Sequence, residues 1–416
     1  MHRVEIFMPF ADPEKYDRGM TKLSDVAKKV GVSTATASLV FNNRPGVNAK
    51  TRKRVLNAAA ELGYVPNNVA RSLAMNQSRT IGLIVTDIEN PFFGSLTRHI
   101  DEHARRNRFS LLLALSGDDH ALEDRIIETF IGECVDGIIV VPTQLVRTEF
   151  AAYERLRKRG IPFVFSTTYY PGYDADYVMT DLELGSYRLT RYLLELGHQD
   201  IVFLVGADRS APICALRTRG FERAYAERGL VHDASRIVPC ARPDFQSGYV
   251  ESQRLLEGKR PDAVITINDL LALGAQKAFK EAGYSIPRDI SLAGYDDVIF
   301  ASISDLHFTT VRQDIPEIAR LTVELIIERI IGAAKQDVRT LIPPELLVRD
   351  STGAPWRRIG GIGAAPGARA SDEDAPPPDS EWRPPESLYE PREDSQKRPR
   401  PTKPAKRSRS PAQGGS

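Results

Sequence analysis

Residues 21–43 read Thr21-Lys-Leu-Ser-Asp-Val-Ala-Lys-Lys-Val-Gly-Val-Ser-Thr-Ala-Thr-Ala-Ser-Leu-Val-Phe-Asn-Asn43. Apolar side chains recur here at the spacing that places them on one face of a helix, in two groups: Leu23, Val26, Ala27 and Val30, then Ala37, Val40 and Phe41. Gly31 supplies the permissive backbone of a tight turn, and Ser33 is a typical cap of the second helix. The stretch therefore predicts a helix-turn-helix, whose second helix enters the DNA major groove.

A third helix and a strong local charge follow. Asn48 is a suitable cap for this helix, and Val55, Ala59 and Leu62 form its apolar stripe. Between residues 20 and 80, ten lysines and arginines face only two acidic residues, a net charge of +8, whereas the whole chain carries +1. Such an excess is what neutralisation of DNA phosphates requires. A small helical bundle with solvated lysines is the alternative.

Four strings in this region are those of a known family. They are Leu23-Ser-Asp-Val-Ala27, Gly31-Val-Ser-Thr-Ala-Thr36, Val47-Asn-Ala-Lys-Thr-Arg52 and Gly63-Tyr-Val-Pro-Asn-Asn-Val-Ala-Arg-Ser-Leu-Ala74. With them, residues 21–77 resemble the DNA-binding headpiece of the lactose-repressor/galactose-repressor (LacI/GalR) family of bacterial transcription regulators, and the resemblance continues to about Asp350. It implies a homodimeric repressor that reads a pseudo-palindromic operator in double-stranded DNA and responds to a small-molecule effector.

The resemblance assigns DNA contacts residue by residue. The expected DNA-binding residues are Thr34, Ala35, Thr36, Ser38, Leu39, Asn42, Asn48, Lys50, Thr51, Arg52, Asn67, Ala70 and Leu73. Thr34, Ala35 and Leu39 lie opposite the apolar stripe of the second helix and are expected to meet base edges. Residues 67–78 resemble the family's hinge helix and linker, where a leucine at the position of Leu73 wedges between base steps. A linker with weak helicity is the alternative, since so short a helix is unstable alone.

From Thr80 onward, short apolar runs alternate with helical stretches. Runs such as Ile81–Val85, Gly137–Val141 and Ile201–Val205 predict parallel strands that are covered on both faces. Two groups of runs predict an α/β effector domain at 80–350 with two doubly wound parallel-sheet subdomains. The first is expected to comprise about 80–180 plus 311–331, and the second 182–308 plus 340–350. The order resembles the periplasmic-binding-protein fold of the family's effector domain.

Polar residues follow several predicted strands, where open parallel sheets bind ligands. The resemblance assigns the effector pocket to Phe92, Phe93, Arg217, Asn268 and Asp296. These groups suit a sugar, because a carboxylate accepts from adjacent hydroxyls, a guanidinium donates, and aromatic rings cover an apolar ring face. Structural alternatives are a helix cap for Asn268, a turn for Asp296, and the core for the phenylalanines. Asp181-Leu182 replaces the Asp-Asn pair of many members, which removes one polar contact.

The rest of the sequence argues against other classes of protein. Its 416 residues are 42% hydrophobic and 27% charged, as in ordinary globular proteins of two to three domains, and no apolar run reaches membrane-spanning length. Charge and proline interrupt the first ten residues, so we expect no signal peptide there, and three cysteines without metal-like spacing fit a reduced, cytoplasmic protein. No catalytic or metal motif occurs, so we expect no enzyme activity, no metal and no cofactor. A solute-binding protein of the same fold is the alternative.

The two ends of the chain lack apolar periodicity. Residues 1–20 are either a disordered extension or precede a true start at Met20. Residues 351–416 form a Pro/Arg-rich tail that cannot bury enough apolar surface to offset the entropy of ordering, so we expect it to be disordered. Its basic run at 397–409 either adds non-specific affinity for nucleic acid or is simply solvated.

Overall fold

The computed structural model describes residues 21–42, 44–64, 77–143, 145–333 and 337–355. The expectations for residues 1–20, for the hinge residues Asn67, Ala70 and Leu73, and for the tail beyond residue 355 lie outside the described residues. Among the helices of the described ranges, none is both long and apolar enough to cross a membrane.

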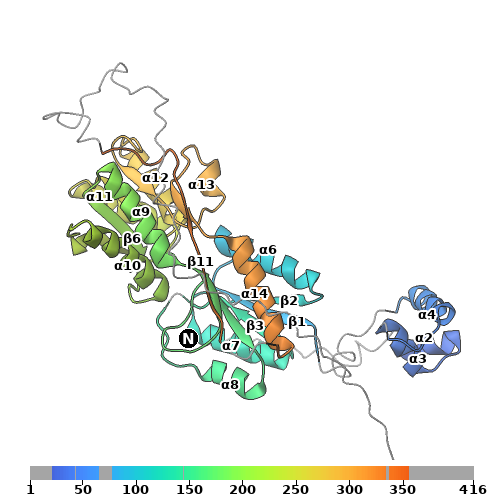
Figure 1. The fold of residues 1–416 in the computed structure, drawn as a ribbon. Coiled ribbons are helices and arrows are strands. Elements are labelled where there is room, and N and C mark those ends of the chain that lie inside the picture. The colour runs from blue at the N-terminus through green and yellow to red at the C-terminus, as the bar shows by residue number, and fades with distance from the viewer. Residues whose placement is uncertain (1–20, 43, 65–76, 144, 334–336, 356–416) are drawn as a thin grey trace, which may run out of the picture.

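Three helices form the N-terminal headpiece: α2 (Leu23–Val30), α3 (Thr34–Phe41) and α4 (Ala49–Glu61) (Figure 1). Ser33 Oγ accepts from the Thr36 N–H at 3.0 Å, and Asn48 Oδ1 accepts from the Thr51 N–H at 2.8 Å, so both predicted caps are confirmed. Gly31 ends α2 in the left-handed conformation, at φ 73°. The apolar faces enclose one small core of Val26, Ala27, Val30, Ala37, Val40, Val55, Ala58 and Ala59.

Two arginines of α4 hold the ends of the other headpiece helices. Arg54 Nη2 donates to the carbonyl oxygen of Val30 at 2.7 Å. Arg52 donates to the carbonyl oxygens of Val40 at 3.0 Å and Arg44 at 2.9 Å. Because the last carbonyls of a helix have no partner within the helix, these bonds satisfy groups that would otherwise need water. Helix α4 thereby fixes the position of α3.

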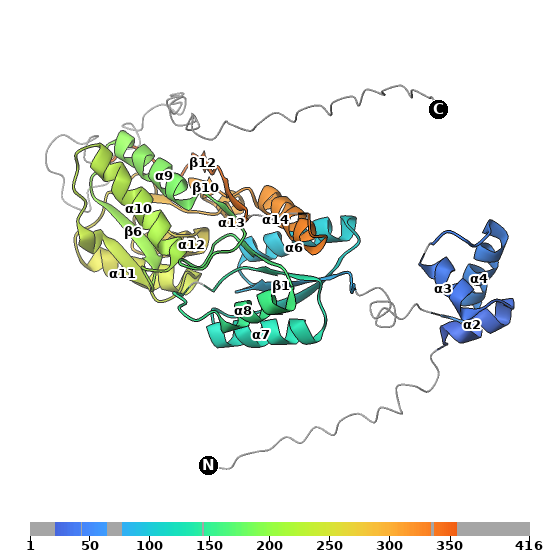
Figure 2. The same ribbon diagram turned by 60° about the horizontal axis from the view of Figure 1, so that its bottom comes forward.

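The first subdomain is built on a six-stranded parallel sheet in the order β11-β5-β4-β3-β1-β2. Its strands are β1 (Thr80–Val85), β2 (Ser110–Leu115), β3 (Gly137–Val140), β4 (Phe163–Ser166), β5 (Tyr177–Thr180) and β11 (Arg339–Ile342). One face is covered by α6 (Pro91–Arg106) and α14 (Ile315–Ile330), and the other by α7 (His120–Gly132) and α8 (Ala151–Arg159) (Figures 1 and 2). Each face has its own apolar cluster, which explains the near-continuous apolar runs in the strands.

The second subdomain is built on a four-stranded parallel sheet in the order β7-β6-β8-β9. Its elements are β6 (Ile201–Gly206), β7 (Ile237–Cys240), β8 (Ala263–Thr266), β9 (Ser291–Ala293), α9 (Leu182–Leu196), α10 (Pro212–Glu227), η1 (Ala234–Arg236), α11 (Phe245–Glu257), α12 (Asp269–Glu281) and α13 (Phe300–Ile303). Helix α9 packs against α10, and α11 packs against α12. Gly220 permits the first contact, since a Cβ there would lie 2.2 Å from the carbonyl oxygen of Glu183.

Three segments join the subdomains: β5 to α9, β10 (Thr310–Arg312) to α14, and β11 to β12 (Glu345–Leu347). Strands β10 and β12 pair antiparallel. We assigned residues 340–350 to the second subdomain, and this is wrong for β11, which pairs with β5 in the first sheet. The pairing buries Ile342 in the apolar cluster that also contains residues of α14, a contact that no local pattern of the sequence predicts.

The predicted start of the tail at residue 351 is also wrong. Ser351 is buried, its Oγ donates to the carbonyl oxygen of Leu292 at 2.5 Å, and it accepts from the Thr309 N–H at 2.8 Å. His198 Nε2 donates to the carbonyl oxygen of Gly353 at 2.8 Å. The second subdomain therefore extends to residue 353, because these bonds lie inside it.

Candidate functional site

The exposed side of α3 carries the residues expected to meet base edges. Thr34 and Ala35 are exposed, and Leu39 is 37% exposed, whereas Ala37 and Val40 on the opposite side are buried. This burial agrees with the predicted register of the helix. The three exposed residues offer one hydroxyl group and two apolar groups to a ligand.

The other predicted contact residues of α3 are tied to one another or to its cap. Thr36 Oγ1 lies 2.9 Å from Ser33 Oγ, so its hydroxyl is held at the start of the helix. Asn42 Nδ2 donates to Ser38 Oγ at 3.2 Å, and both residues are half-buried. These bonds restrict the side chains along one edge of the exposed side of α3.

The start of α4 presents a second candidate contact with DNA. Asn48 caps the helix, Lys50 is exposed, and Thr51 is half-buried. Free backbone N–H groups and a lysine at a helix N-terminus favour a phosphate. The guanidinium of Arg52, another predicted DNA contact, donates to the carbonyl oxygens of Val40 in α3 and of Arg44 after it. It thereby holds α3 in position against α4.

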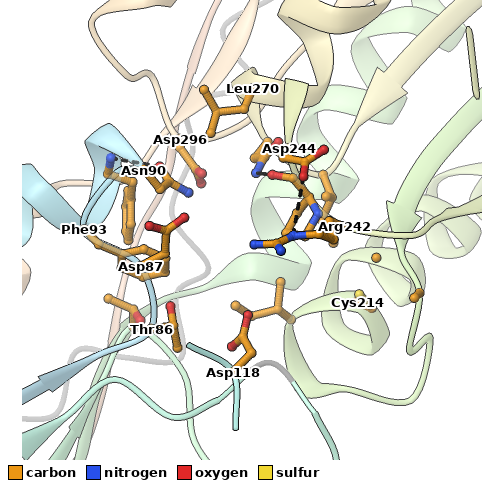
Figure 3. Close-up of a pocket in the computed structure, with 18 of the residues that line it drawn as sticks. Thr86, Asp87, Asn90, Phe93, Asp118, Cys214, Arg242, Asp244, Leu270 and Asp296 are labelled. Atoms are coloured by element: carbon orange, nitrogen blue, oxygen red, sulfur yellow. Dashed lines mark hydrogen bonds and ion pairs between the residues drawn. The ribbon is translucent and has the colours of Figure 1, made fainter. Parts of the chain in front are cut away.

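A cleft of about 490 Å³ lies between the two subdomains. Loops that follow strands of both sheets line it, as expected for the carboxyl ends of parallel strands. In Figure 3, Asp87, Asn90 and Asp296 lie near one another on one side, and Arg242 and Asp244 lie on the other. All five predicted effector residues line the cleft: Phe92, Phe93, Arg217, Asn268 and Asp296.

Arg217 and Asp296 form the buried charged centre of the cleft. Arg217 Nη2 donates to Asp296 Oδ1 at 3.2 Å, Nη1 donates to the carbonyl oxygen of Ile267, and the guanidinium lies 3.7 Å from the centroid of the Tyr295 ring. Gln313 Nε2 donates to the same Oδ1 at 2.7 Å. Burial raises the pKa of Asp296 to about 6, although Arg217 and Gln313 oppose the rise. Asp296 Oδ2 has no hydrogen bond among the described residues, so it is available to a ligand.

Asn268 and the two phenylalanines line the cleft but also have the structural roles that were their alternatives. Asn268 Oδ1 accepts from the Leu271 N–H at 2.9 Å and caps α12, while its Nδ2 donates to the carbonyl oxygen of Pro243 at 2.7 Å. Phe92 and Phe93 pack edge to face, with ring centroids 5.3 Å apart, and belong to the apolar core of the first subdomain. Their rings are therefore held rigidly at the cleft.

Many polar and apolar residues of the cleft were not among the predicted effector residues: Thr86, Asp87, Glu89, Asn90, Asp118, Leu145, Thr167, Leu182, Asp208, Arg242, Asp244, Leu270 and Gln313. Most follow a strand within a few residues, so applying the strand-end rule to every strand would have found them. Asp181 has another role. Its Oδ1 accepts from the Leu184 N–H at 2.9 Å and caps α9.

Two parts of the chain match family models. Residues 22–67 match the bacterial regulatory proteins of the lacI family, and residues 190–352 match the periplasmic binding protein-like domain. The HTH-type transcriptional regulator DegA of Bacillus subtilis is 33% identical over 332 residues, which cover 80% of this chain and 98% of DegA. The chain belongs to the LacI family. It is a DNA-binding transcriptional regulator, since the alternative of a solute-binding protein leaves its headpiece unexplained.

Three further proteins are similar to this LacI-family protein. The ribose operon repressor of Haemophilus influenzae is 31% identical over 334 residues, covering 80% of this chain and 98% of that protein. The Lac repressor dimer bound to operator and the anti-inducer ONPF is 28% identical, with a TM-score of 0.72 over 80% of this chain and 100% of that chain. A LacI family regulator from Enterococcus faecium with bound ribose is 29% identical, with a TM-score of 0.58 over 66% of this chain and 99% of that chain. The predicted fold class is confirmed.

Ligand affinity in the cleft is expected to fall in acid because of Asp296. Its pKa of about 6 lies above the usual value of 3.8, since burial penalises the charged form. A ligand that donates to the carboxylate loses this acceptor as the pH drops through 6, so affinity should decline by up to about tenfold per pH unit below that value. Calorimetric titration with a binding polyol at several pH values measures the decline. Asp296→Asn should bind more weakly and without this dependence; a pH-independent wild type would contradict the role.

Proposed function

We propose that this LacI-family protein is a cytoplasmic, homodimeric repressor that binds a pseudo-palindromic operator and responds to a sugar or related polyol. The observation that carries the ligand class is the buried Arg217–Asp296 pair in the cleft, which Phe92 and Phe93 also line. A carboxylate, a guanidinium and aromatic rings together match the hydroxyls and the apolar face of a sugar. A relative named ribose operon repressor and a family structure that holds ribose support this class.

An exposed apolar surface on the second subdomain supports the homodimer. Ile299, Phe300 and Ile303, in or next to α13, are 60%, 39% and 65% exposed, and Phe245 at the start of α11 is 40% exposed. Phe245 and Ile303 line the same shallow hollow. Exposed apolar groups gathered in this way mark interaction surfaces. A second copy of the chain is the proposed occupant, as the similar Lac repressor is a dimer on its operator.

The ligand would act by favouring one angle between the two subdomains. Residues of both subdomains line the cleft, so a ligand there contacts both. The subdomains also touch directly, since the Val146 N–H donates to the carboxylate of Asp208 at 3.3 Å. A ligand can shift such an equilibrium only by the difference between its affinities for the two arrangements. The direction of the response then depends on which arrangement suits the operator.

Asp136 is proposed to tie the linker to the first sheet. Its carboxylate accepts from the Ser78 N–H at 2.8 Å, the Ser78 hydroxyl at 3.0 Å and the Arg79 N–H at 2.8 Å, just before β1 begins. Asp136→Ala should weaken operator binding by about tenfold, because bonds worth roughly 0.5–1.5 kcal/mol each are lost where the chain enters the domain. Gel retardation with a bound genomic fragment measures the change.

Asp101→Ala is the matched control for Asp136→Ala. Asp101 is also an aspartate of the first subdomain, but it pairs with Arg105 at 2.8 Å on the exposed surface of α6. Surface pairs of this kind contribute about 0–1 kcal/mol, so operator binding should stay unchanged. Equal losses in both variants, or full operator binding by Asp136→Ala, would reject the proposed tie.

The proposed regulator is tested by recovering genomic fragments that the purified protein retards, and then footprinting them. Each protected site should consist of two half-sites related by a two-fold axis, because a dimer places its headpieces symmetrically. Transcription from the adjacent promoter should rise when the protein is removed. Binding without any sequence preference would contradict the operator, and a fall in transcription would contradict repression.

A further inference from the structure

Three buried polar atoms at the cleft have no hydrogen-bond partner among the described residues. They are Thr167 Oγ1, Gln313 Oε1 and Arg217 Nε, on residues that are 3%, 5% and 4% exposed. Buried polar groups without partners are costly and uncommon, so these atoms mark places where a ligand would supply the partner. Thr167 also has a φ of 68°, a left-handed conformation that is rare for a β-branched residue and concentrates at ligand sites.

Among these three atoms and Asp296 Oδ2, three can accept a hydrogen bond and two can donate one. Gln313 Nε2 donates to the Asp296 carboxylate, which fixes the orientation of the amide and leaves Oε1 as an acceptor. Asp296 Oδ2 is a second acceptor while the acid is ionised, and the Thr167 hydroxyl can either donate or accept. Only Arg217 Nε must donate. The cleft therefore has more unpaired hydrogen-bond acceptors than unpaired donors, and it favours a ligand that donates hydrogen bonds.

Acidic side chains outnumber basic ones around the cleft: Asp87, Glu89, Asp118, Asp208, Asp244 and Asp296 line it, against Arg217 and Arg242. Both arginines are already engaged. Arg217 bonds to Asp296 and to a carbonyl oxygen, and Arg242 lies 3.4 Å from Asp244. In Figure 3, Asp87 and Asp296 lie on one side of the cleft, Asp244 lies on the other side, and Asp118 lies below them. An anion that entered would meet negative charge from several directions.

We propose that the effector is a polyhydroxylated molecule without an acidic group, and that the cleft rejects the phosphorylated and carboxylated forms of the same molecule. The inference rests on the proposed function, because it takes this cleft as the effector site. Hydroxyl groups and a protonated amine supply the hydrogens that Gln313 Oε1 and Asp296 Oδ2 accept, whereas ionised phosphates and carboxylates supply acceptors. Charge repulsion adds to this mismatch and weakens as salt is added.

The test uses matched sets of a pentose or hexose, its amino derivative, its phosphate and its uronic acid, each titrated calorimetrically into the full-length protein. For a sugar that binds, the amino derivative should bind at least as tightly, and both anionic forms at least about tenfold more weakly at low salt. An anionic form that binds more tightly than its neutral parent overturns the inference. A panel in which only anionic compounds bind, or none binds, also overturns it.

Two substitutions separate the hydrogen-bond contribution from the charge contribution. Thr167→Val keeps the shape and removes Oγ1, so the neutral ligand should bind about threefold to tenfold more weakly. Glu89→Lys reverses one exposed charge of the cleft. It should lower the ratio of the affinity for the neutral sugar to the affinity for its phosphate by roughly threefold or more. Glu133→Lys makes the same change on the exposed end of α7, outside the cleft. It should change neither the affinity for the neutral sugar nor the ratio of that affinity to the affinity for the phosphate. If the two cleft variants behave like the control, the inference fails.

Gel retardation of operator fragments by the same samples, without ligand, keeps the two proposals apart. Absence of specific retardation contradicts the proposed regulator whatever the ligands do. Specific retardation together with a preference for anionic ligands overturns only the inferred ligand class. Specific retardation with rejection of the anionic forms supports both.

Discussion

Replacing Glu123 with alanine is expected to lower the free energy of unfolding by about 3–5 kcal/mol, because an arginine and two tyrosines would lose a buried carboxylate that they share. Glu123 is a fully buried residue of α7. Its carboxylate accepts from Arg147 Nη1 at 2.7 Å and from the hydroxyls of Tyr153 at 2.7 Å and Tyr170 at 2.9 Å. Burial raises the pKa of Glu123, and these donors oppose the rise. Alanine would remove this acceptor next to an apolar cluster, leaving Arg147 only its bonds to Asp124 and the Glu149 carbonyl oxygen.

Glu128→Ala is the matched control on the same helix. Glu128 pairs with Arg155 on the surface, and both side chains are nearly half exposed. An exposed pair contributes about 0–1 kcal/mol, so this variant should unfold almost like the wild type. Urea unfolding followed by circular dichroism compares the two variants. A difference of less than about 1 kcal/mol between them would show that the buried network adds little to stability.

The headpiece could be predicted because its determinants are local in the sequence. Ser33 bonds to Thr36 and Asn48 bonds to Thr51, so each cap and its partner lie three residues apart. The apolar faces of the helices follow from the same short spacing. The two bonds of Arg52 to carbonyl oxygens could not be predicted in this way. Its partners lie eight and twelve residues away, and an arginine that binds carbonyl oxygens looks in sequence like one that binds phosphate.

The wrong subdomain boundary arose from a contact that is distant in sequence. The strand β11 joins β5, and Asp176 just before β5 accepts from the Val338 N–H at 2.7 Å across a separation of 162 residues. A short run of apolar residues predicts a strand but does not say which sheet receives it. The pairing of β11 with β5 and the burial of Ile342 together assign the strand to the first subdomain.

The candidate effector site was predicted only in part, because some of its features depend on contacts between residues that are distant in the sequence. The strand-end rule and the resemblance placed Arg217 and Asp296 in one cleft, as observed. Thr167 and Gln313 directly follow β4 and β10, so the strand-end rule could have included them, but their unpartnered buried atoms depend on the whole surrounding fold. Asn268 shows that one residue can both cap a helix and line the cleft.

Replacing Leu39 with arginine is expected to shift operator preference toward guanine at one base pair in each half-site. Leu39 is 37% exposed on the side of α3 opposite the buried Ala37 and Val40. Leucine can offer only an apolar contact, most naturally to a thymine methyl group, whereas arginine donates bidentately to O6 and N7 of guanine. Such a contact discriminates between bases by about 1–3 kcal/mol. Selection of binding sites from random DNA by both proteins measures the shift.

Leu56→Arg separates base reading from simple attraction to DNA. It adds the same charge at a position of α4 that is 47% exposed and outside the predicted base-reading side. Binding to all sequences should strengthen about equally, because phosphate attraction carries no sequence information. Uracil in place of the contacted thymine removes only the methyl group, so it should weaken binding by the wild type and not by Leu39→Arg. If Leu39→Arg keeps the wild-type preference at every position, Leu39 does not face the groove, and base reading by α3 falls to Thr34 and Ala35 alone.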